Sequence, residues 1–425
     1  RAYDFGSLFY WAGAYEPAAT LYEIAAASHT GSGAEMASAQ RLALIDGDYE
    51  LAQYHTARRI RRYESKIAVR DLIGLSVIAG NQEQAWSIVS GFQPMFDQPE
   101  LWVGALIAHR SEDRALESVV EWAYEDGREG LGSTAGLLSI RFAFLAHTLD
   151  RTPSAALGKM LRTRWTGSPI DLMPNPLLML SRELPFFEVR YRGDLAWRND
   201  KKIDSLLIVA ADAMIALESQ DYRAAFERLD LAADYYELGE FLPAYAWAAA
   251  KTGQTARIKG FLGGARNYKR KMRNQANSRN KLFDENLAEA MLFGAAGQVP
   301  EAIDHLKKAN ALIVHNGNRF ILTRYQIMES ARLLYEDTKE PAYRDFALDL
   351  ARRNAVIEPI QGYAHSFVAM LSGDRQERII SLARVLVLDP QSWSIEKADS
   401  RELEEARKLA ARGYPMPTID TRADT

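Results

Sequence analysis

The chain has 425 residues and is too long to form one ordinary core. Of these residues 48% are hydrophobic and 25% are charged, which is typical of folded proteins. Its formal net charge of −4 excludes a general attraction to polyanions, and the absence of cysteine excludes disulfides, thiolate zinc sites and a cysteine nucleophile. The longest stretch without a charged side chain, Pro359 to Gly373, is too short and too polar to cross a bilayer. We therefore expect several domains or an array of repeats, with no transmembrane segment in this chain.

The first predicted element is a pair of amphipathic helices within residues 1–28, in which Gly13 ends the first helix and Ala18 lies in the second. The same spacing recurs 34 residues later and again after a further 33. The corresponding positions along the chain are Gly47 with Ala52, Gly80 with Ala85, Gln220 with Ala225, Gly253, Gly297 with Ala302, and Gly373. This period predicts a series of similar helical hairpins.

A physical reason connects the two small residues. A glycine at the end of the first helix can adopt the left-handed backbone that terminates a helix. The alanine lies where the second helix crosses its partner closely, so only a small side chain fits there. One such hairpin cannot bury both of its faces, so neighbouring hairpins must stack.

This spacing resembles the tetratricopeptide repeat, whose pattern is roughly W-x2-L-G-x2-Y…A-x3-F…P over about 34 residues. The resemblance covers residues 1–95 and 205–312, with a further unit near 360–392. Pro359 and Pro390 correspond to the proline that closes the second helix, whereas the Trp-Leu-Gly signature of the first helix is mostly missing. The resemblance implies an all-α, right-handed superhelical solenoid of stacked helix-turn-helix repeats.

Two breaks in the period suggest how the chain is divided. Residues 168–200 contain Pro169, Pro174, Pro176 and Pro185, which forbid a regular helix through the first half of that segment. We interpret it as an elbow, with an irregular hairpin or a loop packed in the groove as alternatives. The predicted division is an N-terminal repeat array at 1–167, the elbow at 168–200, a C-terminal array at 201–412, and a frayed tail or linker at 413–425.

The second break is a basic insertion. Between Gly253 and Gly297 the spacing grows by about ten residues, and the added length falls in residues 264–281. No acidic residue occurs from Phe241 through Phe283, while ten Lys and Arg do. The candidates for binding a polyanion, such as an acidic polysaccharide, are Arg266, Tyr268, Lys269, Arg270, Lys271 and Arg273. The alternative is a lengthened, solvated helix, and nucleic acid is disfavoured because the rest of the chain is acidic.

The sequence offers little catalytic chemistry. The histidines have no metal-ligand spacing, and there is no phosphate-binding loop or nucleophile elbow, so we predict no metal, no cofactor and no enzyme activity. Glu183, Glu188 and Asp194 lie among aromatic residues in the proline-rich break and could serve sugar chemistry. Ordinary loop charges are the simpler interpretation of these three acids.

Aromatic side chains give the remaining candidate site. In the resembling family the first helix of each pair lines the concave face, and five aromatics of this chain fall at such places: Tyr10, Trp11, Trp247, Tyr363 and Phe367. On a groove they would anchor a peptide partner. In the core they would fill space between helices.

The resulting hypothesis is a non-catalytic scaffold that binds a protein or peptide on its concave surface, the commonest use that the resemblance implies. Similar arrays also serve bacterial envelope assembly and exopolysaccharide export, and the lack of cysteine suits the periplasm or cell envelope, with the cytoplasm as the alternative. Two other functions are left open. One is a carrier for an acidic polymer, and the other is an α-helical enzyme acting on sugar polymers.

Overall fold

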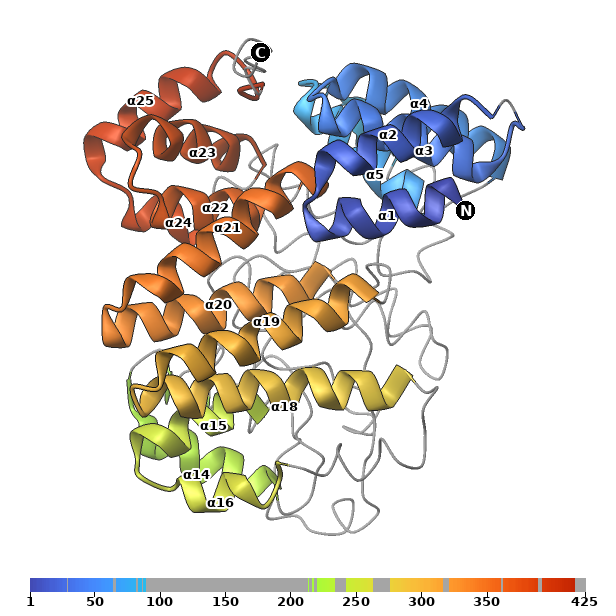
Figure 1. The fold of residues 1–425 in the computed structure, drawn as a ribbon. Helices are drawn as coiled ribbons and strands as arrows, with labels where there is room; N and C mark the ends of the chain where they lie inside the picture. Colours follow the sequence, from blue (N-terminus) through green and yellow to red (C-terminus); the bar gives the residue numbers. More distant parts are fainter. Residues whose placement is uncertain are drawn as a thin grey trace, which may run out of the picture. The chain divides into compact units, whose positions relative to one another are not determined.

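The computed structural model describes these parts of the chain: 1–63 except 29, 66–88 except 82 and 86, 213, 216–217, 220–233, 242–262, 276–315, 321–388 except 361, and 392–416. Every regular element in these ranges is a helix (Figure 1). The all-α class is thereby confirmed for the part of the chain that is described. The proline-rich segment 168–200 and most of the basic insertion lie outside it.

The chain forms two compact units. Unit 1 comprises Arg1–Ala123, Gly317–Arg319 and Leu348–Thr425, and unit 2 comprises Tyr124–Asn316 and Phe320–Ala347. This differs from the predicted division into two consecutive arrays, because the helices after Leu348 group with the N-terminal helices. The Tyr10 hydroxyl donates to the carbonyl of Ile357 at 3.1 Å, and the Tyr15 hydroxyl donates to the carbonyl of Arg353 at 2.7 Å.

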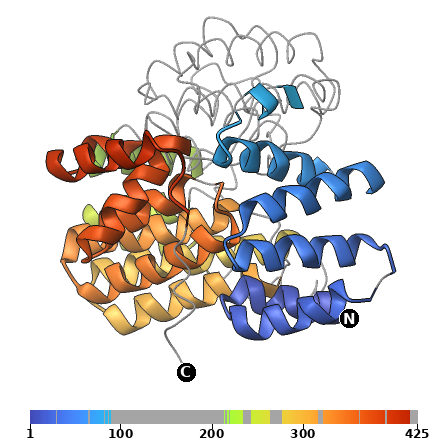
Figure 2. The same cartoon turned by 90° about the horizontal axis from the view of Figure 1, so that it is seen from above.

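Unit 1 contains two sets of helices. In the N-terminal set each helix packs against the next along the chain, as Figures 1 and 2 show. This set is α1 (Ala2–Ala12), α2 (Tyr15–Ala26), α3 (Gly33–Ile45), α4 (Tyr49–Tyr63) and α5 (Lys66–Ile78). The other set is the C-terminal part of α21 (Pro341–Ile357), α22 (Gly362–Leu371), α23 (Arg375–Leu388), α24 (Trp393–Lys397) and α25 (Ser400–Ala410).

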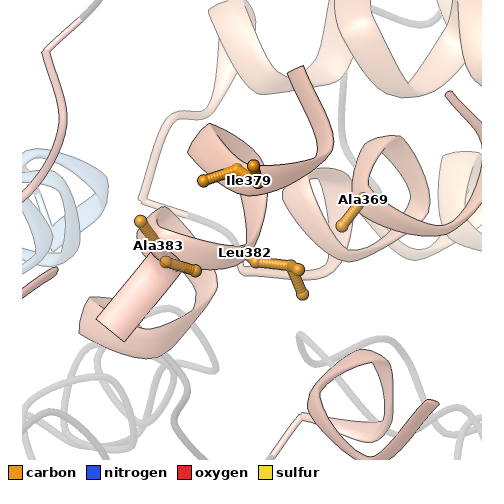
Figure 3. Close-up of a cluster of buried hydrophobic side chains, with 5 residues drawn as sticks. Ala369, Ile379, Leu382 and Ala383 are labelled. Carbon is orange, nitrogen blue, oxygen red and sulfur yellow. The ribbon is translucent and has the colours of Figure 1, made fainter. Parts of the chain in front are cut away.

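The C-terminal set has its own small core. Ala369 of α22 packs with Ile379, Leu382 and Ala383 of α23 and with Ala406 of α25 (Figure 3). Three of these five side chains are alanines, so the three helices approach one another closely. The predicted closing prolines fit this layout, since α21 ends two residues before Pro359 and α23 ends two residues before Pro390.

The described helices of unit 2 follow the same hairpin plan. They are α14 (Tyr222–Ala233), α15 (Leu242–Lys251), α16 (Thr255–Lys259), α18 (Ala276–Ala295), α19 (Val299–His315), α20 (Ile321–Thr338) and the first residues of α21. Helix α18 packs against α15, α19 and α20. A Cβ added to Gly294 of α18 would lie 2.3 Å from Cδ2 of Leu334, so a larger residue at this α18–α20 contact would displace the Leu334 side chain.

Six of the predicted turn positions have the left-handed backbone, whereas Gly373 does not, and there the Asp374 amide donates to Ser372 Oγ at 3.0 Å. At Gly13 the backbone is left-handed, with φ of 79°, and the amides of Gly13 and Ala14 donate to the carbonyls of Tyr10 and Phe9. This pair of bonds is the Schellman motif, which satisfies carbonyls that the helix leaves open. The same pair forms after the first helix of five further hairpins, where the left-handed residue is Gly47, Gly80, Gln220, Gly253 or Gly297.

A substitution at Gly297 tests the conformational part of this turn. Its φ is 74° and no atom lies within 4 Å of an added Cβ, so only the backbone opposes a side chain there. We expect Gly297→Ala to lower the free energy of unfolding by about 1–2 kcal/mol. Gly373→Ala is the matched control, since Gly373 is equally open but its φ is not positive. Chemical denaturation of both variants measures the difference, and equal losses would contradict the turn assignment.

The small residues of the second helices are also where the spacing predicts. The alanines at this repeat position have no exposed surface: Ala18, Ala52, Ala85, Ala225 and Ala302. Tyr22, four residues after Ala18, is equally buried. These positions therefore bring adjacent helices into close contact, as the repeat interpretation requires.

Two features differ from the prediction. The segment 413–416 was expected to fray, yet Tyr414 is buried against Tyr49 of α4 and His365 of α22. In addition, a tight turn that the spacing did not indicate joins α20 to α21. Lys339 takes the left-handed turn position there with φ of 59°, and the first buried residue of α21 is Tyr343.

Candidate functional site

The structure places four of the five predicted anchors in the core. Tyr10, Trp247, Tyr363 and Phe367 each expose 5% of their surface or less, which is the space-filling role that the sequence left open. Only Trp11 is partly exposed. Their role in partner binding stays a prediction. The basic candidates from Arg266 to Arg273, and the acids Glu183, Glu188 and Asp194, lie outside the described residues.

Tyr10 and Trp11 nevertheless meet at one unusual place in unit 1, around Arg41. Arg41 projects from α3 between α1 and α2, and its Nη1 donates to Ser7 Oγ at 2.5 Å and to the Tyr22 hydroxyl at 2.7 Å. Its guanidinium carbon lies close to four aromatic rings. The distances to the ring centroids are 5.1 Å for Tyr3, 5.5 Å for Tyr10, 5.4 Å for Trp11 and 5.5 Å for Tyr22.

Two tyrosines of this cluster, Tyr10 and Tyr22, stay neutral. Burial raises the pKa of Tyr10 well above 10, although the positive charge of Arg41 acts in the opposite direction. Burial also raises the pKa of Tyr22, again against the effect of Arg41. The rings therefore offer π-faces and hydroxyl dipoles to the guanidinium, but no compensating negative charge.

No carboxylate pairs with Arg41 in the part of the chain that the structure describes. Among the described residues, Nη1 of Arg41 has two hydrogen-bond acceptors, whereas its Nε and Nη2 have none. Arg41 is neither fully buried nor fully exposed. A charged group in this setting has lost much of its hydration, and an anion that reached Nε and Nη2 would compensate it.

The surroundings of Trp247 in unit 2 show the contrasting case. The ammonium of Lys251 lies 4.5 Å from the Trp247 ring centroid, but it also pairs with Asp337. Nearby, Asp230 accepts hydrogen bonds from the Tyr245 hydroxyl and from Nε of Arg257. Lys251 and Arg257 thus both have acidic partners within unit 2, whereas Arg41 has none among the described residues.

The spacing argument missed Arg41, although the repeat contains a signal for it. Six residues before the turn glycine, other hairpins have an uncharged residue: Ser7, Gly74, Trp247 and Met291. Arg41 is the charged exception at this position. Aligning the repeats on their glycines and looking for such an exception would have selected it.

Comparisons with known proteins assign no family. No family model matches the sequence, and no curated protein sequence matches it. Among solved structures, the crystal structure of the yeast Tom70 aligns with 97% of this chain and 94% of that chain, at 13% sequence identity and a TM-score of 0.30. A likeness this weak carries no conclusion about relationship or activity. Among the described helices, none is long and apolar enough to cross a membrane.

Proposed function

We propose that this protein is a non-catalytic helical-repeat scaffold for a protein partner, and that unit 1 binds a carboxylate of that partner at Arg41. The observation that supports the proposal most directly is that Nε and Nη2 of Arg41 have no acceptor among the described residues, although four aromatic rings surround the guanidinium. Stacked helical hairpins provide a rigid frame that holds such a side chain in one orientation.

The energetics favour an anionic ligand at this place. The aromatic rings offset part of the desolvation of the guanidinium, at about 0.5–2 kcal/mol for a cation–π contact. A carboxylate approaching Nε and Nη2 can accept two parallel hydrogen bonds, which is the geometry that arginine offers and lysine does not. Partner binding would then supply a carboxylate for Arg41, which forms no ion pair among the described residues of unit 1.

A double-mutant cycle tests the proposal. Peptides selected from a display library against the wild-type protein are synthesised with each Asp or Glu replaced by its amide and with an amidated C-terminus. We expect one carboxylate whose removal weakens binding to the wild type by about tenfold or more, and whose removal has little effect on Arg41→Met. Fluorescence anisotropy of the labelled peptides gives both dissociation constants.

Arg352→Met is the matched control, because Arg352 lies in the same unit and already pairs with Glu377 at 2.7 Å. This variant should keep the wild-type preference for the carboxylate peptide. If the effect of Arg41→Met and the effect of removing the peptide carboxylate are strictly additive, the selected carboxylate does not bind at Arg41.

Three more specific functional expectations from the sequence stay predictions. A setting in bacterial envelope assembly or polysaccharide export stays a prediction from the resemblance and the absence of cysteine. A carrier function for an acidic polymer depends on the insertion at 264–281, most of which lies outside the described residues. Catalysis by Glu183, Glu188 or Asp194 likewise stays a hypothesis.

A further inference from the structure

The exposed side of α4 carries a second set of arginines, distinct from Arg41. Helix α4 buries Tyr49, Ala52 and Thr56. The side chains on its opposite side are exposed and fall within about 100° of the helix circumference at 3.6 residues per turn. We name this set the arginine stripe; it consists of Leu51, Tyr54, Arg58, Arg61 and Arg62.

The three arginines of the stripe have no ion-pair partner in the part of the chain that the structure describes. Arg58 instead lies over the ring of Tyr54, at 5.8 Å from its centroid. Two other exposed arginines of unit 1 do have acidic partners, since Arg352 pairs with Glu377 and Arg375 pairs with Glu405. The stripe therefore presents unneutralised positive charge on one rigid helix.

The stripe is not purely ionic. Leu51 exposes 43% of its surface and Tyr54 exposes 57%, and both precede the arginines along the same side of α4. Exposed apolar side chains among cations have no benefit for solubility, and they are the side chains that bury most area when a partner binds. A ligand that fits the stripe thus combines negative charge with apolar groups.

We propose that the arginine stripe binds an acidic, amphipathic segment of a protein partner. Carboxylates of the segment would meet the guanidinium groups of Arg58, Arg61 and Arg62, and its apolar side chains would pack on Leu51 and Tyr54. The inference shares with the proposed function only the premise that the partner is a protein, and it does not depend on Arg41.

Charge argues against a long polyanion at this surface. Glu50 is exposed on α4 itself, and Glu16 and Glu23 are exposed on α2. A nucleic acid or an anionic membrane extending beyond the stripe would meet these carboxylates, and the whole chain is acidic, with a formal charge of −4. A short acidic segment that extends no further than the arginine stripe avoids this repulsion.

The test uses a defined probe and the full chain. The probe is a fluorescein-labelled amphipathic peptide of Glu, Leu and Ala, compared with a counterpart in which Gln replaces Glu. We expect the acidic peptide to bind the wild type and the triple variant R58E/R61E/R62E to bind it at least about tenfold more weakly, with the weakening reduced at high salt. Tyr54→Ala should weaken binding several-fold without changing the salt dependence.

The triple variant R401E/R407E/R412E is the matched control. These three arginines are also exposed in unit 1, and they form no ion pair among the described residues, so the control makes the same change of charge elsewhere. It should keep wild-type affinity within about twofold. Circular dichroism establishes that both triple variants retain the helical content of the wild type.

Several outcomes overturn the inference. Equal loss of binding in the two triple variants would mean that only total charge matters. Tighter binding of single-stranded oligo(dT), or of phosphatidylserine vesicles, than of the acidic peptide would assign the stripe to another class of ligand. Peptide binding that is lost in Arg41→Met but kept in R58E/R61E/R62E would remove the stripe while leaving the proposed function in place.

Discussion

Phe367→Ala should lower the free energy of unfolding by about 3–5 kcal/mol. The Phe367 side chain has no exposed surface in α22, and removing a fully buried phenylalanine loses its transfer free energy and leaves a cavity. Urea denaturation followed by circular dichroism measures the loss. The result also decides the role of a residue that the sequence proposed as a partner anchor, because a surface anchor would contribute little to stability.

Phe5→Ala in α1 is the control for this experiment. It removes the same side chain from a position with 56% exposure, so its effect should stay within about 0.5–1 kcal/mol. Comparable losses in the two variants would contradict the placement of Phe367 in the core of unit 1. A loss confined to Phe367→Ala would assign this aromatic to packing.

Acidification should destabilise the protein through His365. This residue of α22 is buried, its Nε2 lies 3.0 Å from the Tyr414 hydroxyl and 3.1 Å from the carbonyl of Pro359, and its Nδ1 has no partner among the described residues. Burial, with a smaller effect of the nearby Arg384, lowers the pKa of His365 from 6.5 to about 3. The folded state therefore holds the neutral imidazole, and the Tyr414 and Tyr49 hydroxyls and the Arg384 guanidinium belong to the same contact.

The direction of the pH effect follows from proton counting. Between the unfolded pKa of 6.5 and the folded pKa of about 3, the unfolded chain binds the additional proton. The free energy of unfolding should therefore fall as the pH falls through this window, by up to about 1.4 kcal/mol per pH unit, with no contribution from His365 above it. Denaturation curves at several pH values measure the slope.

His365→Gln should flatten that slope, whatever its effect on stability at neutral pH. The slope is the decisive quantity because carboxylates contribute equally in the wild type and the variant. His55→Gln is the control, since His55 is only partly buried and burial together with Arg58 lowers its pKa less. An unchanged slope in His365→Gln would mean that the imidazole is already accessible to protons in the folded state.

The repeat spacing identified the local structure well because its causes are local. A left-handed residue at Gly13 and a small side chain at Ala18 are needed wherever two helices turn and cross, so they recur at a fixed period. The turn between α20 and α21 could not be predicted in this way, because Lys339 occupies the left-handed position and Arg344 stands where the alanine is expected. There the left-handed backbone is tolerated by a residue that gives no signal in the sequence.

Which helices belong to unit 1 could not be derived in the same way. Its defining contacts, such as that between Tyr10 and Ile357, join residues far apart in the chain, and a local period contains no information about them. The aromatic anchors show a related difficulty. Their repeat position places them between helices, but whether another helix covers them depends on these distant contacts.

The makeup of unit 1 has a consequence for how the protein is made. The Tyr10 hydroxyl and its acceptor at Ile357 are 347 residues apart, so α1 and α2 leave the ribosome long before the helix that completes their surroundings exists. Closing so long a loop costs little more entropy than closing a shorter one, about 0.6 kcal/mol per doubling of length. The delay matters more than the entropy, because this surface of α1 and α2 stays uncovered until α21 has been translated. A nascent chain stalled before α21 would leave it exposed.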